Sequence, residues 1–182
     1  MLVTALYHKL YLSESIHRSE RRWATPAELG GLSMQEIRGQ TVGILGYGHL
    51  GRECARLFTT FGARIIAATR DGTCKPIGGF LVPGTGDHSG ALPVAWHKTS
   101  EQASMDDFFK EADIVVDCLP GGGGNDKFIG ERALCAMKDD ALLINIGRGT
   151  TVDTDALVRA LESTAERKGA CGTLAIGGAG LE

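Results

Sequence analysis

The sequence predicts an α/β protein of three layers, in which helices cover both faces of a doubly wound parallel sheet. Short apolar runs alternate along the chain with segments of helical periodicity, which is the pattern of successive βαβ units. The runs are almost continuous in Val, Ile, Leu and Ala, as in strands that are covered on both faces. Right-handed crossovers would then place helices on both sides of the sheet.

Length and composition fit a globular protein. The chain has 182 residues, of which 43% are hydrophobic and 23% charged, and its net charge of −3 gives no reason to expect nucleic acid or a membrane surface as a partner. No apolar run is long enough to span a bilayer, and the N-terminus lacks a signal-peptide pattern. The five cysteines are scattered without metal-ligand spacing, so we expect reduced thiols, a cytoplasmic location and no metal site.

The first 40 residues predict a helical arm. Apolar residues roughly follow one face of a single helix from Leu2 to about Arg22, and Pro26 and a glycine pair mark a linker after it. We therefore expect an N-terminal helix and linker at 1–40 and the sheet domain at 41–182.

The sheet domain is expected to alternate strands and helices. One stretch interrupts this pattern, because it holds three prolines and six glycines. The expected order is a strand at 41–45, a helix at 49–61, a strand at 64–68, the irregular segment at 71–100, a helix at 104–111, a strand at 113–119, a glycine loop at 121–124, a helix at 131–137, a strand at 141–146, a helix from an N-cap at Thr154 to about 167, and a last strand within 173–181.

The turn after the first strand carries a Gly-x-Gly-x-x-Gly pattern. Gly46 permits the tight turn, Gly48 lets the backbone approach a phosphate, and Gly51 lets helix and strand pack closely. Free N–H groups at the start of a helix attract anions. The alternative is a plain strand-to-helix turn in a glycine-rich chain, but the strand before the pattern and the helix after it favour a dinucleotide site.

Residues suited to ligand binding follow all four central strands. In an open parallel sheet, ligands bind beyond the carboxyl ends of the strands, which share one edge. The residues at these ends are Gly46 to Gly51 after the first strand, Thr69 and Arg70 after the second, Cys118, Leu119 and Pro120 after the third, and Asn145, Ile146, Gly147, Arg148 and Gly149 after the fourth.

Three stretches, 37–51, 113–120 and 137–157, together resemble the cofactor domain of the D-isomer-specific 2-hydroxyacid dehydrogenases in order and spacing. The resemblance runs from about residue 1 to 181, and the irregular segment lies outside the common pattern. It implies a Rossmann-type domain that binds NAD or NADP, within an enzyme that reduces small 2-keto acids to D-2-hydroxy acids. It also implies a homodimer in which the N-terminal helix takes part.

The same resemblance implies roles for individual residues. Arg148 would be the catalytic arginine, because a guanidinium is always charged and can grip a substrate carboxylate with two hydrogen bonds. Read alone, this arginine would more simply pair with a helix end or a surface carboxylate. The expected cofactor-binding residues are Gly46, Tyr47, Gly48, His49, Leu50, Gly51, Thr69, Arg70, Cys118, Leu119, Pro120, Asn125, Ile146 and Gly147.

Two departures from the family pattern concern the cofactor. The family often has an acidic residue where this chain has Thr69, followed by Arg70, and these two residues favour NADP because they can bind a 2′-phosphate that an acid would repel. Asp71 keeps NAD as the alternative. The four glycines at 121–124 replace hydroxyl residues and proline, so we expect a flexible connector and weaker affinity.

Another departure concerns catalysis. The family's acid–base pair of Glu and His would lie beyond residue 182, and the substrate domain is also missing, so the chain looks cut at both ends. We expect this chain to bind cofactor without full catalysis. The alternative function is a non-catalytic, regulatory dinucleotide-binding module, which the missing pair favours and Arg148 disfavours.

Overall fold

The computed structural model describes residues 1–29, 35–78, 82–166 and 178–181, which form the predicted doubly wound α/β fold. All neighbouring strands of its six-stranded sheet are parallel, in the order β3-β2-β1-β4-β5-β6. The strands are β1 (Thr41–Leu45), β2 (Arg64–Thr69), β3 (Pro93–Lys98), β4 (Ile114–Asp117), β5 (Leu142–Asn145) and β6 (Gly178–Leu181). The helices are α1 (Leu2–Tyr7), α2 (Leu10–Glu20), α3 (His49–Thr60), α4 (Gln102–Glu111), α5 (Glu131–Ala136) and α6 (Thr154–Glu166), with a 3-10 turn η1 (Gly149–Thr151).

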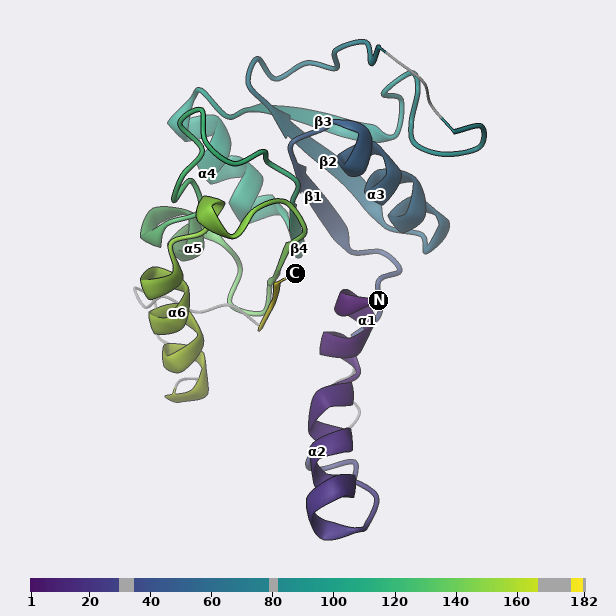
Figure 1. Cartoon of the computed structure of the whole chain (residues 1–182), viewed down its shortest axis with the longest axis vertical. Coiled ribbons are helices and arrows are strands. Elements are labelled where there is room, and N and C mark those ends of the chain that lie inside the picture. Colours follow the sequence, from purple (N-terminus) through teal and green to yellow (C-terminus); the bar gives the residue numbers. More distant parts are fainter. Residues whose placement is uncertain (30–34, 79–81, 167–177, 182) are drawn as a thin grey trace.

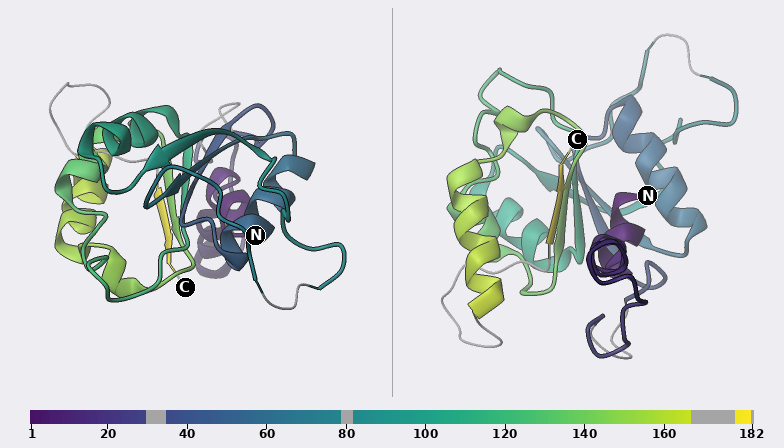
Figure 2. Two further views of the ribbon diagram at one scale, coloured as in Figure 1. Left: turned by 90° about the horizontal axis from the view of Figure 1, so that it is seen from above. Right: turned by 60° about the horizontal axis from the view of Figure 1, so that its bottom comes forward.

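Two hydrophobic layers hold the helices on opposite faces of the sheet. Alternate strand residues such as Val42 and Ile44 pack with α1 and α3, whereas Leu45 and Val115 pack with α4, α5 and α6. Figure 2 shows the sheet between these two groups of helices. The strands are therefore buried on both faces, which explains their nearly continuous apolar sequences.

The N-terminal arm is two helices rather than the single predicted one. Lys9 adopts a left-handed conformation with φ of 48° and separates α1 from α2. Val3 and Tyr7 are buried against the sheet, while Leu10 is 61% exposed on α2. Figure 1 shows α2 extending away from the sheet. The periodicity was misleading here, because contact with the sheet ends after α1; on α2, Leu10 and Tyr11 are exposed and Ile16 is buried.

The segment expected to be irregular contains β3. This strand lies at the edge of the sheet and is only partly buried, so its sequence lacks the apolar run of a central strand. Pro93 begins it, a position where proline is tolerated. A second correction concerns α6: Asp153, not Thr154, caps the helix, since its carboxylate accepts from the amides of Asp155 and Ala156. Of the last predicted strand, 178–181 forms β6 and 173–177 lies outside the described residues.

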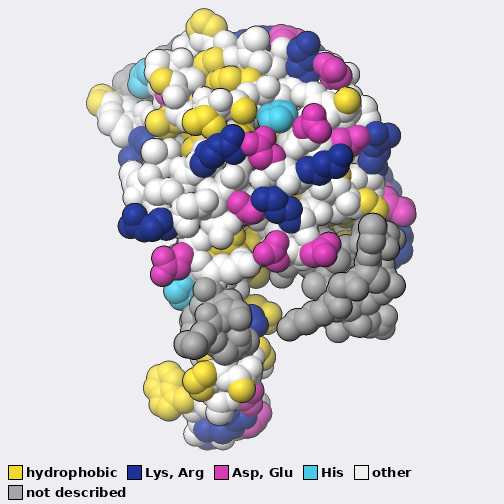
Figure 3. All heavy atoms as spheres, turned by 180° about the vertical axis from the view of Figure 1, so that it is seen from behind, with side chains coloured by type: hydrophobic (Ala, Val, Ile, Leu, Met, Phe, Trp, Pro, Cys, Tyr) yellow, Lys and Arg dark blue, Asp and Glu magenta, His cyan; other side chains and the backbone are white. Residues whose placement is uncertain are grey.

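No described helix has both the length and the apolar character needed to cross a bilayer. On the face seen in Figure 3, basic and acidic side chains are interspersed over the body of the molecule. This face therefore carries no field of a single sign.

Candidate functional site

The glycine turn after β1 is held closed by close backbone packing. Gly46 has a φ of +92°, and a Cβ there would lie 3.1 Å from the carbonyl oxygen of Cys118. A Cβ at Gly51 would overlap the carbonyl oxygen of Gly46. A Cβ at Gly48, in contrast, would meet no atom within 4 Å. Two glycines thus close the turn, and the third leaves open space beside the backbone.

Helix α3 starts directly at this open space. Gly48 is its extended N-cap and offers no side chain to satisfy the first N–H groups. These groups have no partner within the helix, and the helix dipole adds partial positive charge to them. A dinucleotide diphosphate fits this cradle of amides, because it needs hydrogen-bond donors and close access to the backbone.

Tyr47 and Arg52 face the segment between β2 and β3, of which the structure describes 71–78 and 82–92, rather than the open space. The Tyr47 hydroxyl donates to Asp87 Oδ2 at 2.7 Å, and its ring stacks edge-on against Trp96. Arg52 is 2% exposed and donates to the carbonyl oxygens of Asp87 and Lys75, both at 2.5 Å. These side chains anchor the segment to α3. Only the backbone of Tyr47 is therefore available to a ligand at the glycine turn.

Asp87 is the centre of this anchor. Burial by itself would raise the pKa of the Asp87 carboxyl, but hydrogen bonds from Tyr47 and from the amides of Leu92 and Ala91 outweigh it and hold the pKa below its usual value. Burial and the bond to Asp87 raise the pKa of Tyr47. Both groups are thus held in their neutral-pH forms, a charged carboxylate and a neutral phenol.

A cavity of about 310 Å³ lies between the start of α3 and the anchored segment. His49 lines it together with Thr85 and His88. Leu50 does not line this cavity and is 47% exposed. The side chains of His49 and Leu50 therefore lie in different surroundings, and what the two share is a place in the first turn of α3.

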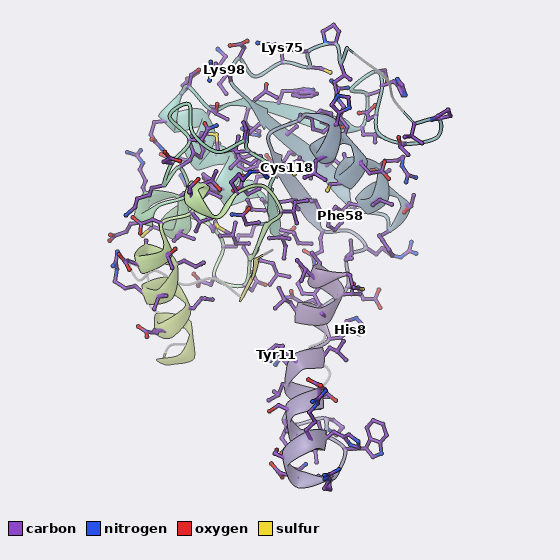
Figure 4. The ribbon with its side chains drawn as sticks, in the orientation of Figure 1. His8, Tyr11, Phe58, Lys75, Lys98 and Cys118 are labelled. Atoms are coloured by element: carbon purple, nitrogen blue, oxygen red, sulfur yellow. The ribbon has the colours of Figure 1, made fainter. Side chains whose placement is uncertain are left out.

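At the end of β2, the Thr69 side chain is turned to its own chain. Its hydroxyl donates to the carbonyl of Thr73 at 2.9 Å and accepts from the Thr73 amide at 3.0 Å. Arg70 is exposed, and its carbonyl oxygen accepts from the Ser100 hydroxyl. Lys75 and Lys98 lie at the same end of the sheet in Figure 4. The carboxyl end of β2 thus carries three cationic side chains.

Cys118 follows β4 directly and is partly buried (Figure 4). A hydrogen bond with Cys54 of α3, together with burial, raises the pKa of the Cys118 thiol. The thiol thus faces α3, and the Cys118 backbone packs on the glycine turn. Leu119 is buried and Pro120 exposed, and the Pro120 carbonyl accepts from Asn125 Nδ2 at 3.0 Å.

The glycine loop after β4 has a specific backbone shape. Gly122, Gly123 and Gly124 all have positive φ, of 70°, 64° and 90°. Three consecutive left-handed residues are strained for any side chain but glycine. The four glycines were expected to be a flexible connector; the structure gives three of them a conformational reason, and the loop's effect on affinity stays a prediction.

The loop after β5 carries Arg148. A Cβ at Gly147 would lie 2.6 Å from the carbonyl oxygen of Leu119, so the loops after β4 and β5 touch at this glycine. The Gly147 amide donates to Asn145 Oδ1, and the Arg148 carbonyl accepts from Asn145 Nδ2, both at 2.9 Å. Arg148 itself is exposed, and its Nη1 donates to the Gly147 carbonyl at 2.9 Å. Its guanidinium is therefore accessible to an added carboxylate.

The structure brings the predicted residues to one edge of the sheet, because β1, β2, β4 and β5 are parallel neighbours. Sequence reasoning missed Asp117 and Thr151, which lie beneath the Arg148 loop and are both fully buried. It also missed Arg52 and Asp87. One signal was available: Asp117 is an acid at the end of a buried apolar run, where an unexplained charge is unusual.

Comparison with known proteins agrees with this geometry. The family model described as "D-isomer specific 2-hydroxyacid dehydrogenase, NAD binding domain" matches residues 1–78 and 87–171. A D-lactate dehydrogenase of Lactobacillus delbrueckii subsp. bulgaricus is 29% identical over 154 residues, 84% of this chain and 38% of that protein. A glyoxylate reductase of Aeropyrum pernix is 36% identical over 126 residues, 69% of this chain and 32% of that protein.

Solved structures give the same result. The NAD-complexed D-isomer specific 2-hydroxyacid dehydrogenase of Lactobacillus delbrueckii ssp. bulgaricus superposes with a TM-score of 0.70 at 29% identity, covering 99% of this chain and 44% of that one. The chain therefore spans less than half the length of the proteins it resembles. With its parallel sheet, glycine turn and matching family model, the chain belongs to the D-isomer specific 2-hydroxyacid dehydrogenase family, whose NAD-binding domain it represents.

Proposed function

We propose that this chain is the cofactor-binding part of an oxidoreductase that reduces a small 2-keto acid to a D-2-hydroxy acid. The observation that carries the proposal is the placement of two features at one sheet edge. One is the open amide cradle at Gly48, and the other is the exposed guanidinium of Arg148. The names of the relatives, D-lactate dehydrogenase and glyoxylate reductase, support a small keto acid as substrate.

Each feature has a separate role in this proposal. The amides at the start of α3 hold the diphosphate, and the backbone ends of β4 and β5 line the path toward Arg148. Arg148 binds the substrate carboxylate and so orients the neighbouring carbonyl. A bound reduced nicotinamide supplies the hydride.

The end of β2 supports a preference for NADP over NAD. Arg70 directly follows β2, and Lys75 and Lys98 lie at the same end of the sheet (Figure 4), so all three bring positive charge to the place where the adenosine ribose would lie. Lys75 pairs with Asp71 at 2.5 Å and Lys98 with Glu101 at 3.7 Å, so part of this charge is already balanced. Arg70 is the side chain that we expect to pair with a 2′-phosphate.

A non-catalytic dinucleotide-binding module is the second candidate. The five histidines lie on the arm, in the first turn of α3, in the segment 71–92 and on β3, so none follows β4 or β5. His97 is tied to its surroundings, since its Nδ1 contacts the Ser104 carbonyl at 3.0 Å. On these grounds we also propose that this chain alone does not turn over glyoxylate.

Three further features belong to the proposal. The arm at 1–40 and the domain at 41–182 are proposed as separate units, although α1 packs on the sheet.

Leu10 and Tyr11, 61% and 62% exposed, support self-association through the arm into a homodimer. The free thiols Cys54, Cys74, Cys118 and Cys135 support a cytoplasmic location.

Fluorescence titration separates the two candidate functions. NADH and NADPH are titrated into the chain with and without millimolar oxamate, a stable analogue of a 2-keto acid. If Arg148 binds the substrate, oxamate tightens binding of the reduced cofactor to the wild type and has no effect on Arg148→Gln. Arg159→Gln, which changes an exposed arginine of α6, is the matched control. A cofactor affinity that is unchanged by oxamate and by Arg148→Gln would favour the regulatory module. Tighter binding of NADH than of NADPH would contradict the NADP preference.

A further inference from the structure

Beneath the loop after β5 lies a buried polar network that touches none of the predicted cofactor-binding side chains. We propose that Asp117 and Thr151 are positioning residues for Arg148, which act by fixing the main chain of its loop. The inference rests on the proposed role of Arg148 in binding the substrate carboxylate. It adds two residues whose effect on that arginine passes through the backbone.

The network converges on the carbonyl oxygen of Arg148. This oxygen accepts from Asn145 Nδ2 at 2.9 Å, from Thr151 Oγ1 at 2.6 Å and from the Thr151 amide at 3.1 Å. The Gly147 amide is bound to Asn145 Oδ1 on the other side. The peptide unit after Arg148 and the one before Gly147 are therefore both held, and this restricts the direction in which the Arg148 side chain leaves the backbone.

Asp117 holds Thr151 in place from the neighbouring strand. Its carboxyl is fully buried, with Oδ1 accepting from the Leu119 amide at 2.9 Å and Oδ2 hydrogen-bonded to Thr151 Oγ1. Both partners of the carboxyl are neutral groups. Burial raises the pKa of Asp117, and these two hydrogen bonds offset only part of that effect. The neighbouring titratable group is Cys118, whose thiol is engaged with Cys54.

The number of protons on Thr151 and Asp117 decides which hydrogen bonds the network can form. The Thr151 hydroxyl has one proton but contacts two acceptors, Asp117 Oδ2 and the Arg148 carbonyl. Both contacts are hydrogen bonds at once when Asp117 is protonated and donates to Thr151, which in turn donates to Arg148. A neutral carboxylic acid is also the form that burial favours. An asparagine in place of Asp117 can make the same pattern, with its oxygen toward Leu119 and its NH₂ group toward Thr151.

Trypsin digestion of the full chain tests the positioning without using activity. The Arg148–Gly149 bond is exposed, and cleavage requires the loop to open locally. Thr151→Val, which removes the hydroxyl at similar volume, should speed cleavage at Arg148 about five- to tenfold, whereas Thr151→Ser should match the wild type. Asp117→Leu should behave as Thr151→Val, and Asp117→Asn as the wild type. Cleavage at Arg21 and Arg22 on the arm is the internal reference for protease activity, and the melting temperature of each variant reports global unfolding.

The outcomes separate this inference from the proposed function. Faster cleavage that is confined to Arg148 in Thr151→Val and Asp117→Leu, and absent from Thr151→Ser and Asp117→Asn, supports the positioning role. Equal cleavage at Arg148 in Thr151→Val and the wild type overturns it, as does fast cleavage in Thr151→Ser. If Thr151→Val unfolds, the rates of cleavage at Arg148 in Thr151→Ser and Asp117→Asn still test the proposal. The response of Arg148→Gln to oxamate tests the proposed function independently, and Thr151→Val should show a weakened response to oxamate.

Discussion

The turn after β1 and the segment after β2 meet on the same helix but are built in different ways. The turn is made by backbone, with Gly46 and Gly51 in contact and Gly48 open. The described parts of the segment, 71–78 and 82–92, are held by side chains, through Arg52, Tyr47 and Asp87. Gly51 and Arg52 are adjacent residues, so one turn of α3 serves both the cradle and the anchor. A site formed by backbone atoms thus comes from residues that are close in sequence, whereas an anchor formed by side chains joins residues that are far apart in sequence.

The largest effect is expected at the closed part of the turn. Gly51→Ala places a Cβ on the carbonyl oxygen of Gly46, and this overlap can be relieved only by moving the backbone of the turn or of α3. We expect a loss of about 3 kcal/mol in the free energy of unfolding. Gly48→Ala is the matched variant, because its Cβ enters open space, and stability should change by less than about 0.5 kcal/mol. Urea unfolding of both variants checks this; equal losses would show that the two glycines do not differ in role.

The anchor comes next in expected size. Arg52→Met keeps the buried stem but removes the donors to the carbonyl oxygens of Asp87 and Lys75. Leaving these acceptors unpaired should cost about 2–3 kcal/mol of unfolding free energy. Arg56→Met, one turn later on α3, removes an arginine that pairs with Glu53 near the surface and should have a smaller effect. A larger effect of Arg56→Met in thermal unfolding would contradict the anchor.

The anchor should also depend on pH. The pKa of Asp87 is depressed in the folded state, so its charged form adds stability above the unfolded pKa of about 4, and this stability is lost as pH falls through the folded value. Asp87→Asn has no such titration. The stability gap between wild type and Asp87→Asn should therefore narrow between pH 6 and pH 3. Urea midpoints at both pH values measure it, and a constant gap would mean that the carboxylate charge is unimportant.

The smallest expected effect is that of the Tyr47 hydroxyl. Tyr47→Phe keeps the ring against Trp96 and removes one hydrogen bond to Asp87, which still accepts from two backbone amides. The cost should be about 1 kcal/mol, with cofactor binding unchanged because the side chain faces the anchored segment. Calorimetric titration checks the second point; a strong loss of cofactor affinity would place the hydroxyl in the cofactor site instead.

Much of the fold could be predicted from sequence because its signals are local. The strand Thr41–Leu45 was located to the residue, and the glycine spacing predicted the turn that follows it. Strand β3 was missed because an edge strand with Pro93, His97 and Lys98 needs no apolar run. The break at Lys9 was missed because periodicity continues past it, while contact with the sheet does not.

In the candidate site, too, the local backbone features could be predicted from sequence and the long-range side-chain contacts could not. Backbone features at Gly46, Gly48 and Gly51 follow from spacing alone. The bond between Thr151 and Asp117 joins residues 34 positions apart, and that between Arg52 and Asp87 joins residues 35 apart. Such pairs depend on strand order and on where a loop returns to the sheet. A single sequence contains no periodic signal for them, although the buried acid at the end of β4 indicates where to look.

Isothermal calorimetry of the chain with NADH and NADPH, repeated on Gly48→Val, tests the central claim most directly. A valine at this position should fill the open space of the cradle without touching the fold. We predict that the wild type binds the dinucleotide and that Gly48→Val binds at least about tenfold more weakly at the same melting temperature. Equal binding by the two proteins, or no binding by the wild type, would contradict a dinucleotide site at this turn.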